Sequence, residues 1–217
     1  YTNYKIGGPA REIYFPHDAV ELSEALELIN SRLTPWYLLG GGSNVLVGDG
    51  FWDGAVIITT EMNEHEIYDD RITCGAGLES SGIAEIALEN AKTGLEFLYQ
   101  LPGSIGGALA MNARYNMRSL SNMFESLVAV HPLEGLITFG KNDVEFSYKH
   151  NSLISGGWIR RRHGPLLLSK PRFFRREGPI LFTDKFLRDR RGVELDVHER
   201  AILEKAVFEI RTIDARK

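Results

Sequence analysis

The chain of 217 residues has a single cysteine, Cys74, and few long apolar runs. One cysteine excludes an internal disulfide framework and a thiolate metal cluster, and it favours a reducing, cytoplasmic setting. No apolar run approaches the roughly 20 residues that cross a bilayer. The first residues also lack the cationic and then apolar pattern of a secretion signal. We therefore expect no membrane insertion.

Metal-ligand spacing and an excess of charge are missing as well. The histidines show no spacing such as H-x-x-x-H, so we predict no metal site; they are His17, His65, His131, His150, His163 and His198. The formal net charge of -4 gives no reason to expect nucleic acid or an anionic membrane as a partner. The sequence gives no indication of the oligomeric state.

What is present is a composition suited to a packed core, with 43% hydrophobic residues. This size fits one large domain or two small ones. Residues 11–16 and 36–40 read as strands, and helical spacing between them with Asp18 as N-cap predicts a helix over residues 17–33. A strand, a helix and a strand in this order predict a βαβ unit with a parallel pair. Residues 54–59 add a further strand.

The rest of the chain mixes hairpins and helices. Residues 64–76 predict a hairpin turning at Asp69 and Asp70. Residues 78–94 predict an amphipathic helix closed by Gly94 at the C′ position, and residues 126–148 alternate as two or more antiparallel strands. The last third is dense in arginine over residues 158–178 and ends in an expected helix over residues 197–213.

Three consecutive glycines, Gly40, Gly41 and Gly42, separate two apolar runs. Glycine admits positive φ and lets a ligand come within hydrogen-bond distance of successive N–H groups, which form a concavity for phosphate. Ser43 and Asn44 add side-chain donors. No helical pattern follows, because residues 45–50 resume a strand-prone run, and no lysine closes the loop, so neither a dinucleotide fingerprint nor a Walker loop fits. A tight strand connection is the alternative to a ligand loop.

A second glycine-rich segment spans residues 102–112, "PGSIGGALAMN". Pro102 and Gly103 impose a turn, and Gly106 with Gly107 keeps one face of a short helix or bend thin enough for a flat ring to approach. Asn112 offers an amide donor and acceptor to the edge of a heterocycle. Close backbone packing is the alternative reading. Two such segments in one small domain favour a large, flat cofactor that carries phosphates.

Four motifs occur in the order and spacing of a known family. They are "IGGPA" (6–10), "LGGGSNVLV" (39–47), "GLEFLYQLPGSIGGALAMNA" (94–113) and "FSYKHN" (146–151). From about residue 3 to residue 154 the chain resembles the UDP-N-acetylenolpyruvoylglucosamine reductases, the MurB family. These are flavoproteins of peptidoglycan precursor synthesis and cell wall biogenesis.

The resemblance implies an α+β, two-subdomain FAD-binding fold of the PCMH/VAO type. Residues 1–60 would form the first FAD-binding subdomain and residues 61–155 the second. Residues 156–217 would be an atypical or incomplete C-terminal substrate domain. The implied enzyme is an oxidoreductase with non-covalent FAD. NADPH supplies hydride to the flavin, which passes it to the enolpyruvyl group of a UDP-sugar to give UDP-N-acetylmuramate.

The resemblance also implies a set of site residues. The expected FAD-binding residues are Leu39, Gly40, Gly41, Gly42, Ser43, Asn44, Val45, Pro102, Gly103, Ser104, Ile105, Gly106, Gly107, Ala108 and Asn112. Where the family has a Tyr-Arg pair with the arginine beside the enolpyruvyl carboxylate, this chain has Tyr148 and Lys149, the expected catalytic residues. Lysine keeps the positive charge but loses the bidentate geometry of arginine. An exposed strand lysine is the alternative.

The C-terminal third departs from the family. No Gly-Ser-x-Phe follows Lys149, so we assign neither the family's proton-donor serine nor its late glutamate. A cluster of six arginines in this region either binds the substrate's phosphates or forms a solvated face or a subunit contact. Its members are Arg160, Arg161, Arg162, Arg172, Arg175 and Arg176. Two other functions therefore stay open. One is an FAD-binding module without catalysis, and the other is an oxidoreductase of the same fold with another substrate.

Overall fold

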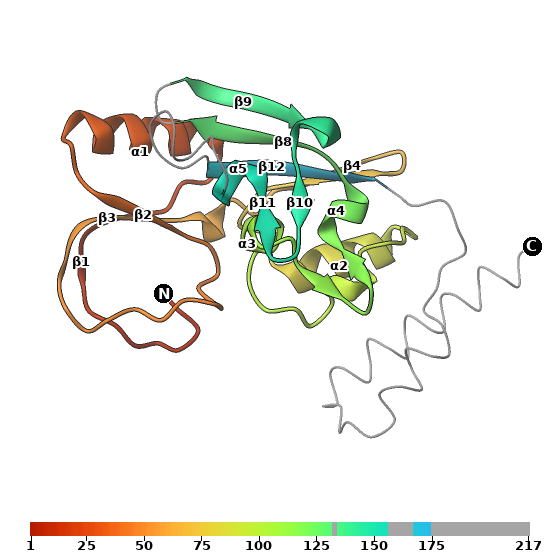
Figure 1. Ribbon diagram of the computed structural model, residues 1–217, viewed down its shortest axis with the longest axis horizontal. Coiled ribbons are helices and arrows are strands. Elements are labelled where there is room, and N and C mark those ends of the chain that lie inside the picture. The colour runs from red at the N-terminus through yellow and green to blue at the C-terminus, as the bar shows by residue number, and fades with distance from the viewer. Residues whose placement is uncertain (132–133, 156–166, 175–217) are drawn as a thin grey trace, which may run out of the picture.

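The computed structural model describes residues 1–131, 134–155 and 167–174, which form a small parallel sheet and a larger antiparallel one (Figure 1). The parallel sheet has the order β1-β3-β2, from β1 (Ala10–Tyr14), β2 (Trp36–Leu39) and β3 (Trp52–Ile58). Helix α1 (Ala19–Ser31) connects β1 to β2, so the predicted βαβ unit is confirmed. The Asp18 carboxylate caps α1, accepting hydrogen bonds from the N–H groups of Val20 and Glu21 at 2.8 and 2.9 Å.

The larger sheet has five strands in the order β4-β5-β12-β8-β9, each antiparallel to its neighbour. The strands are β4 (His65–Tyr68), β5 (Arg71–Cys74), β8 (Phe124–His131), β9 (Gly135–Gly140) and β12 (Leu167–Phe174). The hairpins predicted over residues 64–76 and 126–148 are therefore confirmed. The α+β character and the FAD-binding fold class predicted from the sequence are confirmed as well.

Short elements complete the fold between and beyond these strands. The helices are α2 (Ser80–Glu89), α3 (Ile105–Ala110), α4 (Leu120–Met123) and α5 (Ser152–Ser155). The single 3-10 turns are η1 (Thr59–Glu61), η2 (Glu96–Leu98) and η3 (Lys141–Asp143). Two small hairpins pair β6 (Arg114–Tyr115) with β7 (Arg118–Ser119), and β10 (Phe146–Ser147) with β11 (His150–Asn151).

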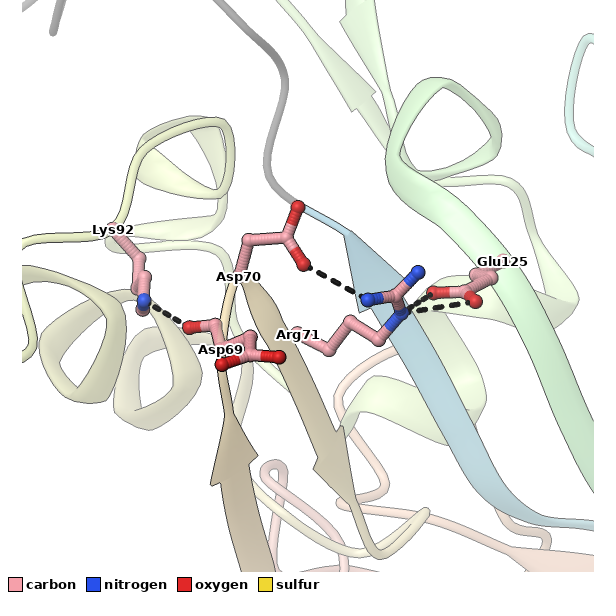
Figure 2. Close-up of polar contacts among 5 residues, drawn as sticks. All are labelled: Asp69, Asp70, Arg71, Lys92 and Glu125. Carbon is pink, nitrogen blue, oxygen red and sulfur yellow. Dashed lines mark hydrogen bonds and ion pairs between the residues drawn. The ribbon is translucent and has the colours of Figure 1, made fainter.

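Strand β12 lies in the middle of the five-stranded sheet although it follows all the other strands in sequence. It comes from the region expected to form the C-terminal domain, so residues of this region also complete the five-stranded sheet. Across β12, the Arg71 guanidinium on β5 contacts both oxygens of Glu125 on β8, at 3.1 and 2.9 Å (Figure 2). This hydrogen bonding to Glu125 raises the pKa of Arg71. The three-part domain division remains a prediction.

Two clusters of buried side chains hold these layers together. The larger cluster lies between the five-stranded sheet and α2, α3 and α4, with Phe124, Ile105 and Leu109 at its centre. The smaller cluster joins α1 to β3 and takes Val130 from β8. Because α1 contacts β8 and β9 as well as packing on β3, it connects the two sheets (Figure 1).

Two local predictions are wrong. Helix α2 ends at Glu89 and not near Gly94, because Ala91 takes the left-handed conformation (φ +51°) and the Lys92 N–H donates to the Ala87 carbonyl, closing the helix. Residues 45–50 form no strand: they run beside the N-terminal segment, where the Gly8 N–H donates to the Gly48 carbonyl at 2.8 Å. Gly94 (φ +115°) instead packs its bare Cα against Met123.

Several predictions fall outside the described residues. These are the C-terminal helix over residues 197–213 and the histidines His163 and His198. The same holds for all the arginines of the cluster except Arg172, whose backbone lies in β12.

Candidate functional site

The two glycine-rich segments, predicted separately, lie against each other. A Cβ atom built on Gly41 would lie 3.1 Å from the Cα of Gly103. The Ser43 hydroxyl donates to the Pro102 carbonyl at 3.3 Å. The loop after β2 and the turn before α3 therefore form one continuous main-chain surface, which we call the double glycine loop (residues 40–45 and 102–108).

The N-terminal segment lies on the other side of the first loop. Gly42 is buried at φ +64°, and a Cβ there would lie 2.9 Å from the Cα of Thr2. The Asn3 N–H donates to the Gly42 carbonyl at 3.3 Å. Because only glycine fits this conformation in this space, the third glycine of the triplet is required by the fold as well as by any ligand.

The double glycine loop is rich in unused main-chain donors. Within the described residues, no N–H group from Gly40 to Val45 donates to a main-chain carbonyl, and the same holds for Gly103 and Ser104. Adjacent N–H groups without protein acceptors favour binding of an anion such as a diphosphate. The residues present therefore fit the diphosphate of FAD.

A third glycine pair supports the loop and was not singled out from the sequence. Gly75 packs against the Met62 carbonyl and Gly77 against the Thr59 carbonyl. Gly106 packs on Ala76 between them, where a Cβ would lie 2.9 Å from the Ala76 Cβ. The Gly106 N–H donates to the Ala76 carbonyl at 2.8 Å. The signal was the short repeat "GAG" directly after a strand. Gly106 is thus explained by packing, whereas Gly107 is exposed.

Three of the predicted site residues direct their side chains into the core. Leu39, Ile105 and Ala108 are at most 9% exposed. Their expected contribution to a cofactor site is therefore restricted to the main chain, and their side chains fix the loop on the sheet and on α3.

Asn112 joins the second glycine segment to the hairpin that carries Tyr148 and Lys149. It is buried at φ +42°; its side-chain amide donates to the Ser147 carbonyl at 3.0 Å and accepts from the Ser121 N–H at 3.2 Å. Both ends of the amide thus have a protein partner. The expected contact of Asn112 with a heterocycle remains a prediction, to which the structure adds a positioning role.

Tyr148 and Lys149 form the two-residue turn between β10 and β11. The Tyr148 side chain is 68% exposed, and the Lys149 ammonium lies 5.5 Å from the centre of its ring. Lys149 adopts φ +53°. The turn therefore projects an aromatic ring and a cation outward from the end of a short hairpin.

Sequence reasoning missed two charged residues, Arg114 beside this hairpin and Glu96 beside the β6–β7 hairpin. The Arg114 guanidinium on β6 lies 6.0 Å from the centre of the Tyr148 ring. Glu96, inside the motif "GLEFL", accepts from the Gly94 N–H and from Arg118 on β7, both at 2.9 Å. The signal for Glu96 was an acid inside an otherwise apolar motif, and the signal for Arg114 was its place directly after the motif of residues 94–113.

The thiol of the chain lies in the core and not on the surface of the double glycine loop. Cys74 has no exposed surface, and burial raises the pKa of its thiol. In the described part of the chain, no group of three His, Cys, Asp or Glu side chains could hold a metal ion. No helix there is both long and apolar enough to span a bilayer.

Comparisons with known proteins agree with this geometry. Residues 10–136 match the model of a family described as FAD binding domain. The chain is similar to the UDP-N-acetylenolpyruvoylglucosamine reductase of Caldicellulosiruptor saccharolyticus, with 38% identity over 70% of this chain and 49% of the relative. It is also similar to the enzyme of that name from Clostridium kluyveri, with 31% identity over 73% of this chain and 52% of the relative.

A solved structure shows the same fold. The crystal structure of UDP-N-acetylenolpyruvylglucosamine reductase from Thermus caldophilus superposes with a TM-score of 0.64 at 26% identity, over 87% of this chain and 62% of that one. The chain spans about half the length of the curated relatives that it matches.

Proposed function

The chain belongs to the family of FAD-binding domains, and on that basis we propose that it is an NADPH-dependent reductase of an enolpyruvyl UDP-sugar in peptidoglycan synthesis. The observation that carries the proposal is the double glycine loop, in which adjacent main-chain donors from residues 40–45 and 103–104 bond to no main-chain carbonyl of the described residues. The names of the similar proteins support the substrate.

FAD would be held without a covalent bond, with its diphosphate on the N–H groups from Gly40 to Val45. The turn from Pro102 to Ala108 would lie along the flat part of the cofactor, where Gly107 is exposed and adds no side chain. When bound, FAD supplies hydride acceptance from NADPH and hydride donation to the substrate. Exclusion of side chains from the loop lets the cofactor approach the main chain.

Lys149 would act on the substrate rather than on the cofactor. Its ammonium group, held beside Tyr148 at the hairpin turn, would lie near the enolpyruvyl carboxylate. A positive charge there stabilises the negative charge that develops as the double bond is reduced. Tyr148 would position the Lys149 side chain through the contact between cation and ring.

An FAD-binding module without catalysis is the second candidate. The observation that favours it is the missing Gly-Ser-x-Phe after Lys149. Such a module would keep the double glycine loop and bind FAD, but NADPH oxidation would not depend on a sugar nucleotide.

The reaction itself separates these candidates. The purified chain, saturated with FAD, is mixed with NADPH in the absence of oxygen, and the flavin absorbance is followed. We expect NADPH to bleach the flavin and UDP-N-acetylenolpyruvoylglucosamine to restore its colour, whereas UDP-N-acetylglucosamine does not. Bleaching that no enolpyruvyl nucleotide reverses would leave only the binding module.

We also propose a cellular setting and a domain organisation. A single buried cysteine supports a reducing, cytoplasmic location. We retain residues 1–60 and 61–155 as FAD-binding subdomains and residues 156–217 as an atypical or incomplete substrate domain, with β12 contributed to the second subdomain. The proposed partners are UDP-sugars, with no nucleic acid and no inserted membrane segment.

A further inference from the structure

Arg114 directly follows the motif of residues 94–113, and it lies beside the proposed substrate site. It is exposed on β6, and its guanidinium lies 6.0 Å from the centre of the Tyr148 ring. The Lys149 ammonium lies 5.5 Å from the same ring. Strand β6 and the turn between β10 and β11 thus bring two cations to one exposed aromatic side chain.

Neither cation is neutralised by the protein. Among the described residues, no carboxylate forms an ion pair with Arg114 or Lys149, although Arg11, Arg32, Arg71 and Arg118 all have one. Contact with an exposed ring stabilises a cation by only about 0.5–1 kcal/mol. Both side chains can therefore exchange the ring for an anionic ligand at little cost.

The positions of both cations are fixed by buried contacts. Arg118 is opposite Tyr115 in the β6–β7 pair and is held by Glu96, whose side chain is 11% exposed. On the other side, the buried Asn112 amide holds the Ser147 carbonyl at 3.0 Å, next to Tyr148. Arg114 follows Asn112 by two residues, so the same short segment contacts both hairpins.

We propose that Arg114 is a specificity-determining residue that binds the enolpyruvyl carboxylate of the substrate together with Lys149. This inference depends on the proposed function. Lysine is a point charge, whereas arginine presents a planar fork that matches a carboxylate. Arg114 would therefore supply the bidentate geometry that Lys149 lacks, and the pair would select a substrate with a carboxylate over one without it.

The test measures binding to the oxidised, FAD-loaded chain by calorimetry, with two nucleotides that differ in the carboxylate. Arg114→Gln should weaken binding of UDP-N-acetylenolpyruvoylglucosamine about tenfold, the usual effect of losing one charged hydrogen bond. Binding of UDP-N-acetylglucosamine, which has the diphosphate but no carboxylate, should change by about twofold or less. Arg114→Lys should recover part of the loss, and Arg32→Gln on the distant α1 end should match the parent chain.

Three results would overturn the inference. If Arg114→Gln leaves both affinities unchanged, Arg114 binds no substrate group. If it weakens both nucleotides equally, the residue serves the diphosphate instead. If the parent chain binds FAD but neither nucleotide, the proposed function fails and this inference fails with it; only in the first two cases does the proposed function survive. Equal thermal midpoints of the variants show that the fold is kept.

Discussion

Cys74 lies on β5 inside the larger core cluster, with no exposed surface. Burial, with a smaller contribution from the charge of Glu64, raises the pKa of its thiol. A thiol attacks disulfide reagents as the thiolate. We therefore expect the native chain at pH 8 to react with a disulfide reagent about a hundredfold or more slowly than the chain unfolded in guanidinium.

The same shift gives a pH dependence of stability. Because the thiol pKa is higher in the folded chain, its contribution to folding is complete below the unfolded pKa of about 8.5 and is lost progressively as the pH rises above it.

In the experiment with the disulfide reagent, similar reaction rates for native and unfolded chain would show that the thiol is accessible, and the Cys74→Ala variant controls for other reactive groups.

Single residues also show what the sequence could predict of the site. Three glycines followed by serine and asparagine predicted a main-chain surface, and Gly42 does adopt positive φ. The sequence could not show that Gly106 serves packing on Ala76, or that the Asn112 amide has protein partners at both ends. Those roles depend on segments that are distant in sequence, which residue types alone do not bring together.

At the scale of elements, the β6–β7 hairpin is held by Glu96 on the η2 turn. Glu96 accepts hydrogen bonds from the Thr93 hydroxyl, the Gly94 N–H and Arg118. Replacing it by glutamine removes the charge and one acceptor oxygen, and it leaves the partly buried Arg118 guanidinium without a carboxylate partner. We expect Glu96→Gln to lower the free energy of unfolding by about 1–3 kcal/mol.

Denaturant titration measures this change, and Glu85→Gln on the exposed face of α2 is the matched control. Glu85 forms no ion pair among the described residues, so its variant should unfold as the parent does. If Glu96→Gln and Glu85→Gln unfold at the same denaturant concentration, Glu96 does not hold the hairpin.

The boundaries of elements were predictable where a local signal fixes them. Helix α1 begins after Asp18 because that side chain caps it, and the sequence shows this directly. Helix α2 ends earlier than expected because Ala91 adopts a left-handed conformation that glycine usually takes. The sequence therefore pointed to Gly94, which instead packs closely on Met123.

At the scale of the whole molecule, the fold class and the family could be predicted from ordered motifs, but the sheet order could not. Strand β12 pairs with β5 and β8, which precede it by tens of residues, and only the assembled sheet shows that it is central. The contact between the loop after β2 and the turn before α3 is of the same kind. Two motifs far apart in sequence become one candidate site only in three dimensions.

Titration of the chain with FAD, followed by flavin fluorescence, tests the central claim that the double glycine loop binds this cofactor through its main chain. Gly41→Val would force the loop away from Gly103, whereas Gly50→Val adds a side chain where no atom lies within 4 Å. We predict that the parent and Gly50→Val bind one FAD per chain and that Gly41→Val loses about 2 kcal/mol or more of binding free energy while it remains folded at the temperature of the titration. Equal FAD affinity of all three chains, or no FAD binding by the parent, would contradict the account.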